Sequence, residues 1–227
     1  MERVARLNQS RVYIRRQGRM TRAQARALAT LWPRYRIELA IERIDWSLPF
    51  GRTAPLFVEI GFGMGHALLA TARVHSDWNC VGIEVYRPGI GAVLNAIEAE
   101  RLANVRIVEG DARAVFANMM TEGMLHRAAI YFPDPWPKSK HHKRRLINAE
   151  FVALIGSRLQ SGAELHLATD WQDYAEEMRR VLDAEPALES LTVGAYAPRD
   201  AERPTTRFEA RGERLGHAVW DFAYRRR

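Results

Sequence analysis

The chain has 227 residues, of which 47% are hydrophobic, a formal net charge of +7 and a single cysteine. This length and apolar content suffice for one domain with a buried core, and they exclude a wholly disordered chain. No apolar stretch approaches the roughly 18 residues of a membrane span, and Cys80 alone cannot form an internal disulfide. The sequence therefore predicts a cytoplasmic protein without membrane contact.

The positive charge is concentrated in a few segments. Residues 1–36 contain ten arginines and one acid, Glu2, while residues 138–145 carry five positive charges and no acid. A third basic group, Arg225–Arg227, closes the chain, and the rest is acidic overall. Positive charge gathered in this way is typical of contact with a polyanion such as nucleic acid. We therefore expect polyanion binding at chosen places.

The first part of the chain is predicted to form a basic N-terminal arm, partly flexible, over residues 1–50, followed by one domain over 51–227. Thr21 is expected to cap a short helix that ends near Pro33. An arginine-rich start is also typical of organelle transit peptides, but those are rich in serine, which is scarce here. An arm that contacts an anionic partner is the favoured interpretation.

From residue 56 onward, short apolar runs alternate with helical patterns. This alternation predicts right-handed βαβ units, hence a mostly parallel sheet with helices on both faces, in the α/β class. The last two strand candidates have no long helix between them, which predicts at least one antiparallel strand added at the edge. The expected strands are 56–60, 80–84, 104–108, 128–132, 164–168, 191–196 and 217–224, and the expected helices are 66–74, 87–102, 112–120, 147–159 and 171–184.

An acidic residue stands at nearly every expected strand end. In doubly wound sheets, ligands bind outside the carboxyl ends of the strands. Carboxylates gathered there indicate a ligand with several hydrogen-bond donors or a positive charge. The residues are Glu59, Glu84, Asp111, Asp134 and Asp170.

A glycine-rich loop follows the first expected strand. Gly61, Gly63 and Gly65 allow a tight turn and close approach of the backbone to a ligand. A dinucleotide loop would have its third glycine where His66 stands, and phosphates need donors rather than acids. Glu84 is placed to accept hydrogen bonds from ribose hydroxyls. The pattern favours a nucleoside without phosphates, such as S-adenosylmethionine; a nicotinamide cofactor, or a turn that only packs a helix on a strand, are the alternatives.

Two further acids have two possible roles each. Asp111 suits the adenine amino group, a hydrogen-bond donor, but it also suits the N-cap of the following helix, and both roles can coexist. Glu59 would either position the methionine end of the cofactor or cap the glycine loop. The residues alone do not separate these roles.

The segment Pro133–Lys138 is the most specific local signal. Three prolines within five residues stiffen the backbone and would hold Asp134 and Trp136 beside a reacting centre. The basic run at 138–145 follows directly, so phosphates held there would bring a nucleotide to Asp134. A rigid proline turn followed by a solvated basic loop is the alternative. The histidines of this run have no cysteine or acidic partners at metal-ligand spacing, so no metal site is predicted.

Six segments, in chain order, carry a family resemblance: VEIGFGMGH (58–66), GIEVYRPG (82–89), EGDA (109–112), YFPDPWPKSKHHKRRL (131–146), LATDW (167–171) and RPTTRFEARGERLGHAVWDFAY (203–224). Through them the chain resembles the bacterial tRNA (guanine-N7-)-methyltransferases. The resemblance covers about residues 56–224 and leaves only the arm outside it. It implies a Rossmann-like class I methyltransferase sheet of seven strands, the last of them antiparallel.

The resemblance also implies the ligands and their contacts. The cofactor would be S-adenosyl-L-methionine, released as S-adenosyl-L-homocysteine, and the partner tRNA, bound by a monomer or homodimer. Arg207 stands where the family more often has lysine, and Ser139 interrupts a usually denser basic run. The implied cofactor contacts are Glu59, Gly61, Gly63, Gly65, Glu84, Asp111 and Asp134. The implied substrate contacts are Lys138, Asp170, Thr206, Arg207, Phe208 and Glu209, with further RNA contacts expected from Lys140, Lys143, Arg144 and Arg145.

The family methylates guanine N7 in the tRNA variable loop, usually at position 46. Neutral guanine has a lone pair and no proton on N7, so N7 can attack a sulfonium methyl in line without a base. Catalysis then rests on alignment and on negative charge near the forming cation, and we assign this catalytic role to Asp134. The alternatives are an exocyclic-amine methyltransferase, a non-catalytic RNA-binding protein and a nicotinamide oxidoreductase.

Overall fold

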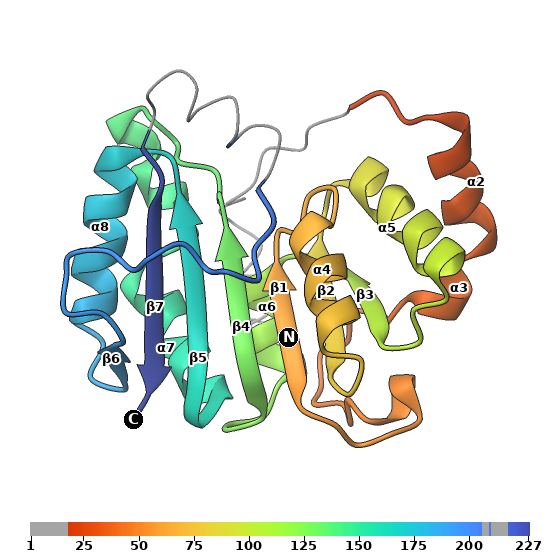
Figure 1. Ribbon diagram of the computed structural model, residues 1–227, viewed down its shortest axis with the longest axis horizontal. Helices are drawn as coiled ribbons and strands as arrows, with labels where there is room; N and C mark the ends of the chain where they lie inside the picture. The colour runs from red at the N-terminus through yellow and green to blue at the C-terminus, as the bar shows by residue number, and fades with distance from the viewer. Residues whose placement is uncertain (1–17, 206–208, 210–217) are drawn as a thin grey trace.

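The computed structural model describes residues 18–205, Glu209 and residues 218–227 (Figure 1). Its strands form one seven-stranded sheet in the order β3-β2-β1-β4-β5-β7-β6. The first five strands are parallel, whereas β7 runs antiparallel to both β5 and β6. The predicted fold class is therefore confirmed. The strands are β1 (Leu56–Ile60), β2 (Asn79–Glu84), β3 (Val105–Glu109), β4 (Leu125–Tyr131), β5 (Leu159–Thr169), β6 (Leu188–Ser190) and β7 (Trp220–Arg226).

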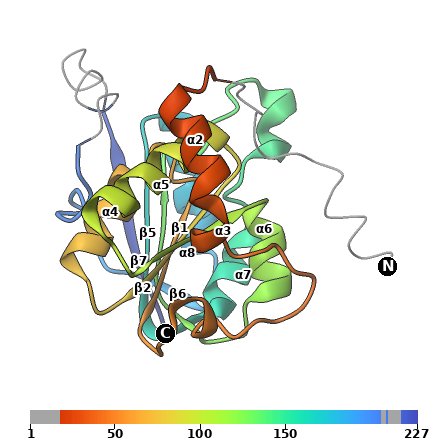
Figure 2. The ribbon, with the colours of Figure 1, turned by 90° about the vertical axis from the view of Figure 1, so that its right-hand side faces the viewer.

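Helices cover both faces of the sheet (Figure 2). Alternate residues of β1 belong to different cores: Phe57 packs with one set of helices and Val58 with the other. Strands buried on both faces are uniformly apolar, which is why these runs could be found from sequence. On one face lie α2 (Arg22–Thr30), α3 (Trp32–Tyr35), α4 (His66–Val74) and α5 (Arg87–Glu100). On the other lie α6 (Ala112–Ala114), the helical turn Val115–Met119, α7 (Ala149–Arg158) and α8 (Gln172–Asp183).

The structure describes the second part of the segment predicted as an N-terminal arm. Residues 1–17 lie outside the described part, but the rest of the predicted arm packs on the domain. Ala27 of α2 is buried against the helices and strands of that face, the amide of Ile37 donates to the carbonyl of Ile107, and buried Trp46 donates to the carbonyl of Met119. Residues 18–50 therefore contact the following domain, and the boundary at residue 50 stays a prediction.

The predicted cap of α2 is present. Thr21 accepts from the amide of Gln24, and the Gln24 side chain accepts from the amide of Thr21, a reciprocal capping box. The helix ends at Thr30, and Pro33 lies in the first turn of α3 instead of ending the helical segment. Proline suits that position, since its missing N–H has no partner in a first turn.

The C-terminal part of the sheet differs from the prediction in two ways. The strand expected at 191–196 is absent: β6 lies just before it, and Val193 in this segment is fully exposed. The half-buried ring of Tyr196 packs against Phe222 and Trp220, so the apolar pattern came from a loop that carries one inward-packed ring. The antiparallel strand β7 lies inside the sheet, and β6 forms the edge.

No helix in the described part of the chain is long and apolar enough to cross a membrane.

Candidate active site

The glycine loop lies at the carboxyl edge of the sheet, between β1 and α4 (Figure 1). Gly61, Gly63 and Gly65 have φ angles of 70°, 55° and 79°, a left-handed backbone that residues with a Cβ rarely adopt. A Cβ at Gly65 would stand 2.1 Å from a methyl group of Val93, so this glycine is required for packing α4 on α5. Among the described residues, a Cβ at Gly61 or Gly63 would meet nothing within 4 Å. These two positions therefore border open space, as a ligand cradle requires.

Glu84, at the end of β2, ties the glycine loop to the next loop. Its carboxylate is buried and accepts from the amide of Gly63 at 2.7 Å, of Val85 at 2.6 Å and of Tyr86 at 2.9 Å. A carboxylate offers about four acceptor sites, so three backbone donors leave capacity for a ligand hydroxyl. The side chain is thus held rigidly beside the cradle.

Glu59, near the end of β1, is a buried carboxyl group for which the described residues supply no cation. Its residue is 3% exposed, and Oε2 has no hydrogen-bond partner within the described residues. Burial, together with the nearby charge of Glu84, raises the pKa of Glu59 to about 8. An unpartnered buried carboxyl group is costly, and a cation beside it would remove the cost. Glu59 therefore fits the positively charged part of a ligand.

Asp111 caps the N-terminus of α6, which is one of the two roles predicted for it from the sequence. It accepts from the amide of Arg113 at 2.9 Å and pairs with the guanidinium of the same residue at 2.9 Å. The side chain lies after β3, at the same edge of the sheet as Glu59 and Glu84. Its contact with an adenine amino group stays a prediction.

The proline-rich loop after β4 has an unusual backbone. Phe132 and Trp136 have φ angles of 52° and 44°. Left-handed conformations in such residues cost about 1–3 kcal/mol each and persist only where the surroundings hold them. Here the amide of Phe132 donates to the carbonyl of Ala168 in the neighbouring strand β5, and the Trp136 side chain is buried. Asp134 lies half-buried between these two residues.

The basic run folds back on this loop. Residues Ser139–Arg144 form a 3₁₀ helix in which the Arg144 guanidinium stands 4.9 Å from the centroid of the Trp136 ring. The ring of His141 meets the same tryptophan edge-on at 5.8 Å. The three lysines of the run, Lys138, Lys140 and Lys143, are exposed.

Two predicted contact residues face the protein instead of solvent. Arg145 is 1% exposed and forms ion pairs with Asp173 and Glu177 of α8, so the expected RNA contact does not fit its position. The carboxylate of Glu209 is also 1% exposed and lies against Arg203 and Arg199. In both cases the protein itself covers the charged group, because a buried charge requires a partner of opposite sign.

The other predicted substrate residues divide between the described and undescribed parts of the chain. Asp170 is exposed directly after β5, next to Trp171. Lys138 is exposed at the end of the proline-rich loop. Thr206, Arg207 and Phe208 lie outside the described residues.

Arg203 supports the site and was not found from the sequence. Its guanidinium pairs with Glu209 at 2.8 Å and with Asp221 of β7 at 3.2 Å, and it lies 5.2 Å from the ring centroid of Phe132. Its partners lie on other elements, so local pattern alone does not reveal it. One signal was available: Asp221 is a charge inside an apolar strand, and such a charge needs a buried partner.

Comparison with known proteins places this site in a family. Residues 53–222 match a family model described as a putative methyltransferase. The tRNA (guanine-N(7)-)-methyltransferase of Thiobacillus denitrificans is 50% identical over 217 residues, covering 96% of this chain and 95% of that protein. The chain belongs to the tRNA (guanine-N(7)-)-methyltransferase family. The relative of the same name from Paraburkholderia xenovorans is 48% identical over 217 residues, with coverage of 96% and 83%.

Solved structures agree with this methyltransferase fold. The 16S rRNA methyltransferase KamB aligns with a TM-score of 0.58 at 13% identity, over 82% of this chain and 95% of that one. A phosphoethanolamine N-methyltransferase of Haemonchus contortus in complex with S-adenosyl-L-methionine aligns with a TM-score of 0.50 at 12% identity, over 89% and 52%. At such low identity these neighbours show the fold alone. The glycine loop and the acids at the strand ends thus lie where a class I methyltransferase has its ligand edge.

Proposed function

We propose that this enzyme transfers the methyl group of S-adenosyl-L-methionine to N7 of a guanosine in the tRNA variable loop, usually position 46. The product is 7-methylguanosine. The observation that carries this proposal is Glu59, a buried carboxyl group whose Oε2 has no partner among the described residues. It precedes a glycine loop in which a Cβ at Gly61 or Gly63 would meet no described atom within 4 Å. This combination suits a cationic nucleoside, and the family relationship names the methyl acceptor.

The residues present fit the cofactor. Glu59 would face the positively charged methionine end, since its buried oxygen needs a donor or a cation. Glu84 retains acceptor capacity for the ribose hydroxyls, and Asp111 would accept from the adenine amino group. Gly61 and Gly63 leave room for close approach. When bound, the cofactor supplies an electrophilic methyl group on a positively charged sulfur.

The reaction requires alignment more than proton transfer. The lone pair of guanine N7 forms the new N–C bond, the C–S bond breaks with its electron pair going to sulfur, and the positive charge moves to the guanine ring. Asp134, held in the proline-rich loop, would place negative charge near this forming cation and accept from the guanine N1–H or amino group. A rigid loop keeps this charge in place before the reaction.

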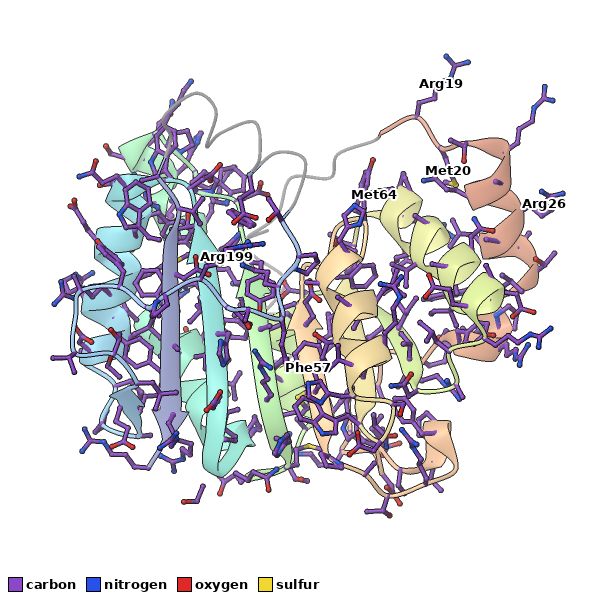
Figure 3. The ribbon with its side chains drawn as sticks, in the orientation of Figure 1. Arg19, Met20, Arg26, Phe57, Met64 and Arg199 are labelled. Atoms are coloured by element: carbon purple, nitrogen blue, oxygen red, sulfur yellow. The ribbon has the colours of Figure 1, made fainter. Side chains whose placement is uncertain are left out.

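Two basic surfaces would contact the tRNA backbone. Lys138, Lys140 and Lys143 are exposed directly beside the loop that carries Asp134. At the other end of the molecule, Arg19 and Arg26 point away from the protein near and on α2 (Figure 3). Phosphate contacts fix the register of a nucleic acid without reading its sequence. This arrangement favours a large folded RNA over a free nucleotide.

The direct test is incubation of the protein with methyl-labelled S-adenosyl-L-methionine and unmodified tRNA. We expect the label in 7-methylguanosine, and none in a transcript whose variable-loop guanosine is replaced by adenosine. Nucleoside mass spectrometry identifies the methylated atom. Label on an exocyclic amine would favour the alternative enzyme, and the absence of any transfer would contradict the proposal.

Replacing Lys138, Lys140 and Lys143 together by glutamine should weaken tRNA binding and reduce its dependence on salt. Each lost phosphate contact lowers the slope of log affinity against log salt by about 0.7–0.9. Filter binding of tRNA over a range of salt concentrations measures this slope, and calorimetry should show unchanged affinity for the cofactor.

Arg73→Gln is the matched control, because Arg73 lies at the far end of α4 and pairs with Glu100. It should leave the salt slope unchanged. An unchanged slope in the triple lysine variant would remove the basic run from the RNA interface.

A further inference from the structure

Arg145 stands apart from the other cations of the basic run. The lysines at 138, 140 and 143 are exposed, whereas the Arg145 side chain is 1% exposed. It lies at the end of the 3₁₀ helix and points inward, with its guanidinium 4.7 Å from the centroid of the buried Tyr174 ring. A phosphate in solvent cannot reach it there.

The guanidinium joins the basic run to two other parts of the protein, the proline-rich loop and α8. Nε donates to the carbonyl of Pro135 at 2.9 Å, Nη1 donates to Glu177, and Nη2 donates to Asp173. Asp173 and Glu177 are four residues apart on α8 and therefore lie on one face of that helix. The hydrogen bond from Arg145 also lowers the pKa of Asp173. A planar guanidinium can hold three such directions at once, which an ammonium group cannot do with the same geometry.

Candidate site residues lie in the loop and directly before the helix that Arg145 connects. Pro135 directly follows Asp134, in the loop where Phe132 and Trp136 have left-handed backbones that need outside support. Helix α8 begins directly after Asp170 and Trp171 at the end of β5. Arg145 is therefore a link between the Asp134 loop and the first turns of α8, the helix that follows Asp170.

We propose that Arg145 is a positioning residue for methyl transfer: it sets the Asp134 loop against the start of α8, while the exposed lysines of the same run bind the RNA. This inference rests on the proposed function for its kinetic consequence. The basic run then has two faces, one that contacts the substrate and one that holds the loop carrying the catalytic residue.

The test compares Arg145→Gln and Arg145→Lys with two reference variants. Arg179→Gln removes an exposed arginine of the same helix α8 and should behave as wild type. Lys140→Gln removes an exposed lysine and should raise KM for tRNA with a shallower salt slope. Arg145→Gln should lower kcat about 10- to 100-fold, because a small misplacement of a reacting group is costly, while KM for tRNA and the salt slope stay within twofold. Arg145→Lys should not restore kcat.

The opposite kinetic result would overturn the proposal. A raised KM for tRNA, a reduced salt slope and an unchanged kcat in Arg145→Gln would make Arg145 an RNA contact. Full rescue by lysine would show that charge alone suffices. If Arg145→Gln fails to fold, the pair Asp173→Asn with Glu177→Gln removes the same link from the side of α8 and should lower kcat in the same way.

Hydrogen exchange gives a readout that does not depend on activity. In protein without tRNA, the amides of Phe132, Asp134, Trp136 and Lys138 should exchange faster in Arg145→Gln than in Arg179→Gln, since the loop loses its support at Pro135. Equal exchange would contradict the positioning role. If the wild type methylates no tRNA, the proposed function fails, and the exchange comparison still decides whether Arg145 holds the loop.

Discussion

Replacing Asp134 by alanine is expected to lower the rate of methyl transfer by at least about 100-fold, while the protein remains folded. The carboxylate lies half-buried in a loop outside the apolar core, so its loss removes charge near the forming guanine cation without leaving a cavity. Single-turnover transfer from labelled cofactor to tRNA measures the rate, and thermal melting confirms the fold. A normal rate in this variant would show that Asp134 is not the catalytic residue.

Two further variants test whether the effect of Asp134→Ala is specific to this carboxylate. Asp134→Asn keeps the size and an acceptor but removes the charge; an equal loss would assign the effect to charge, and a much smaller loss would assign it to positioning. Asp77→Ala removes an exposed acid in the loop before β2, at the opposite edge of the sheet, and should leave the rate unchanged. A loss in that control would point to a general effect of net charge.

Replacing Glu59 by glutamine is expected to stabilise the protein at alkaline pH and to weaken cofactor binding. The pKa of Glu59 is about 8 in the folded protein against 4.5 for an ordinary carboxyl group. Below 4.5 the group is protonated in both states. As the pH rises from 4.5 to 8, the unfolded chain loses its proton first, so stability falls. Each pKa unit corresponds to about 1.4 kcal/mol, so Glu59 costs a few kcal/mol near pH 8.

The measurement is chemical denaturation of the wild type and Glu59→Gln between pH 5 and pH 8. The variant should gain stability relative to wild type as the pH rises, since glutamine cannot ionise. A constant difference across this range would show that the pKa of Glu59 is not raised.

Cofactor binding should also depend on the protonation of Glu59. A cation favours the ionised form of Glu59, so binding near pH 7 should release a proton from the wild type. Titration calorimetry in buffers of different ionisation enthalpy counts the protons, and Glu59→Gln should release fewer. Equal proton release would remove Glu59 from the cationic end of the site.

Local signals accounted for much of the fold. The run 56–60 and the helical pattern 66–74 correspond to β1 and α4 residue for residue, because strands buried on both faces are uniformly apolar and helices repeat every 3.6 residues. The helix cap at Thr21 was predicted because it is a contact across three residues; its reciprocal partner Gln24 came from the structure. The glycine loop was predictable for the same reason, because glycine adopts a left-handed turn at the lowest cost.

The position of the acids also followed from sequence order. The carboxyl ends of parallel strands lie at one edge of the sheet. Glu59, Glu84 and Asp111 are therefore expected at that same edge. The roles of these three acids could not be predicted from the sequence. That Glu59 keeps an unpartnered oxygen while Asp111 caps α6 depends on which groups neighbouring elements bring beside them.

Residues of the same type that are adjacent in the sequence have different environments in the structure. Arg145 and Arg144 are adjacent, yet one is buried between α8 and the proline-rich loop and the other stands over Trp136. In the same way, the sequence predicts that residues 18–50 are part of a basic arm, whereas in the structure α2 of this segment packs against α5. Backbone sterics and apolar periodicity act over a few residues, so a single sequence shows them. Ion pairs and helix packing join groups far apart in the chain, and only the path of the fold decides which of them meet.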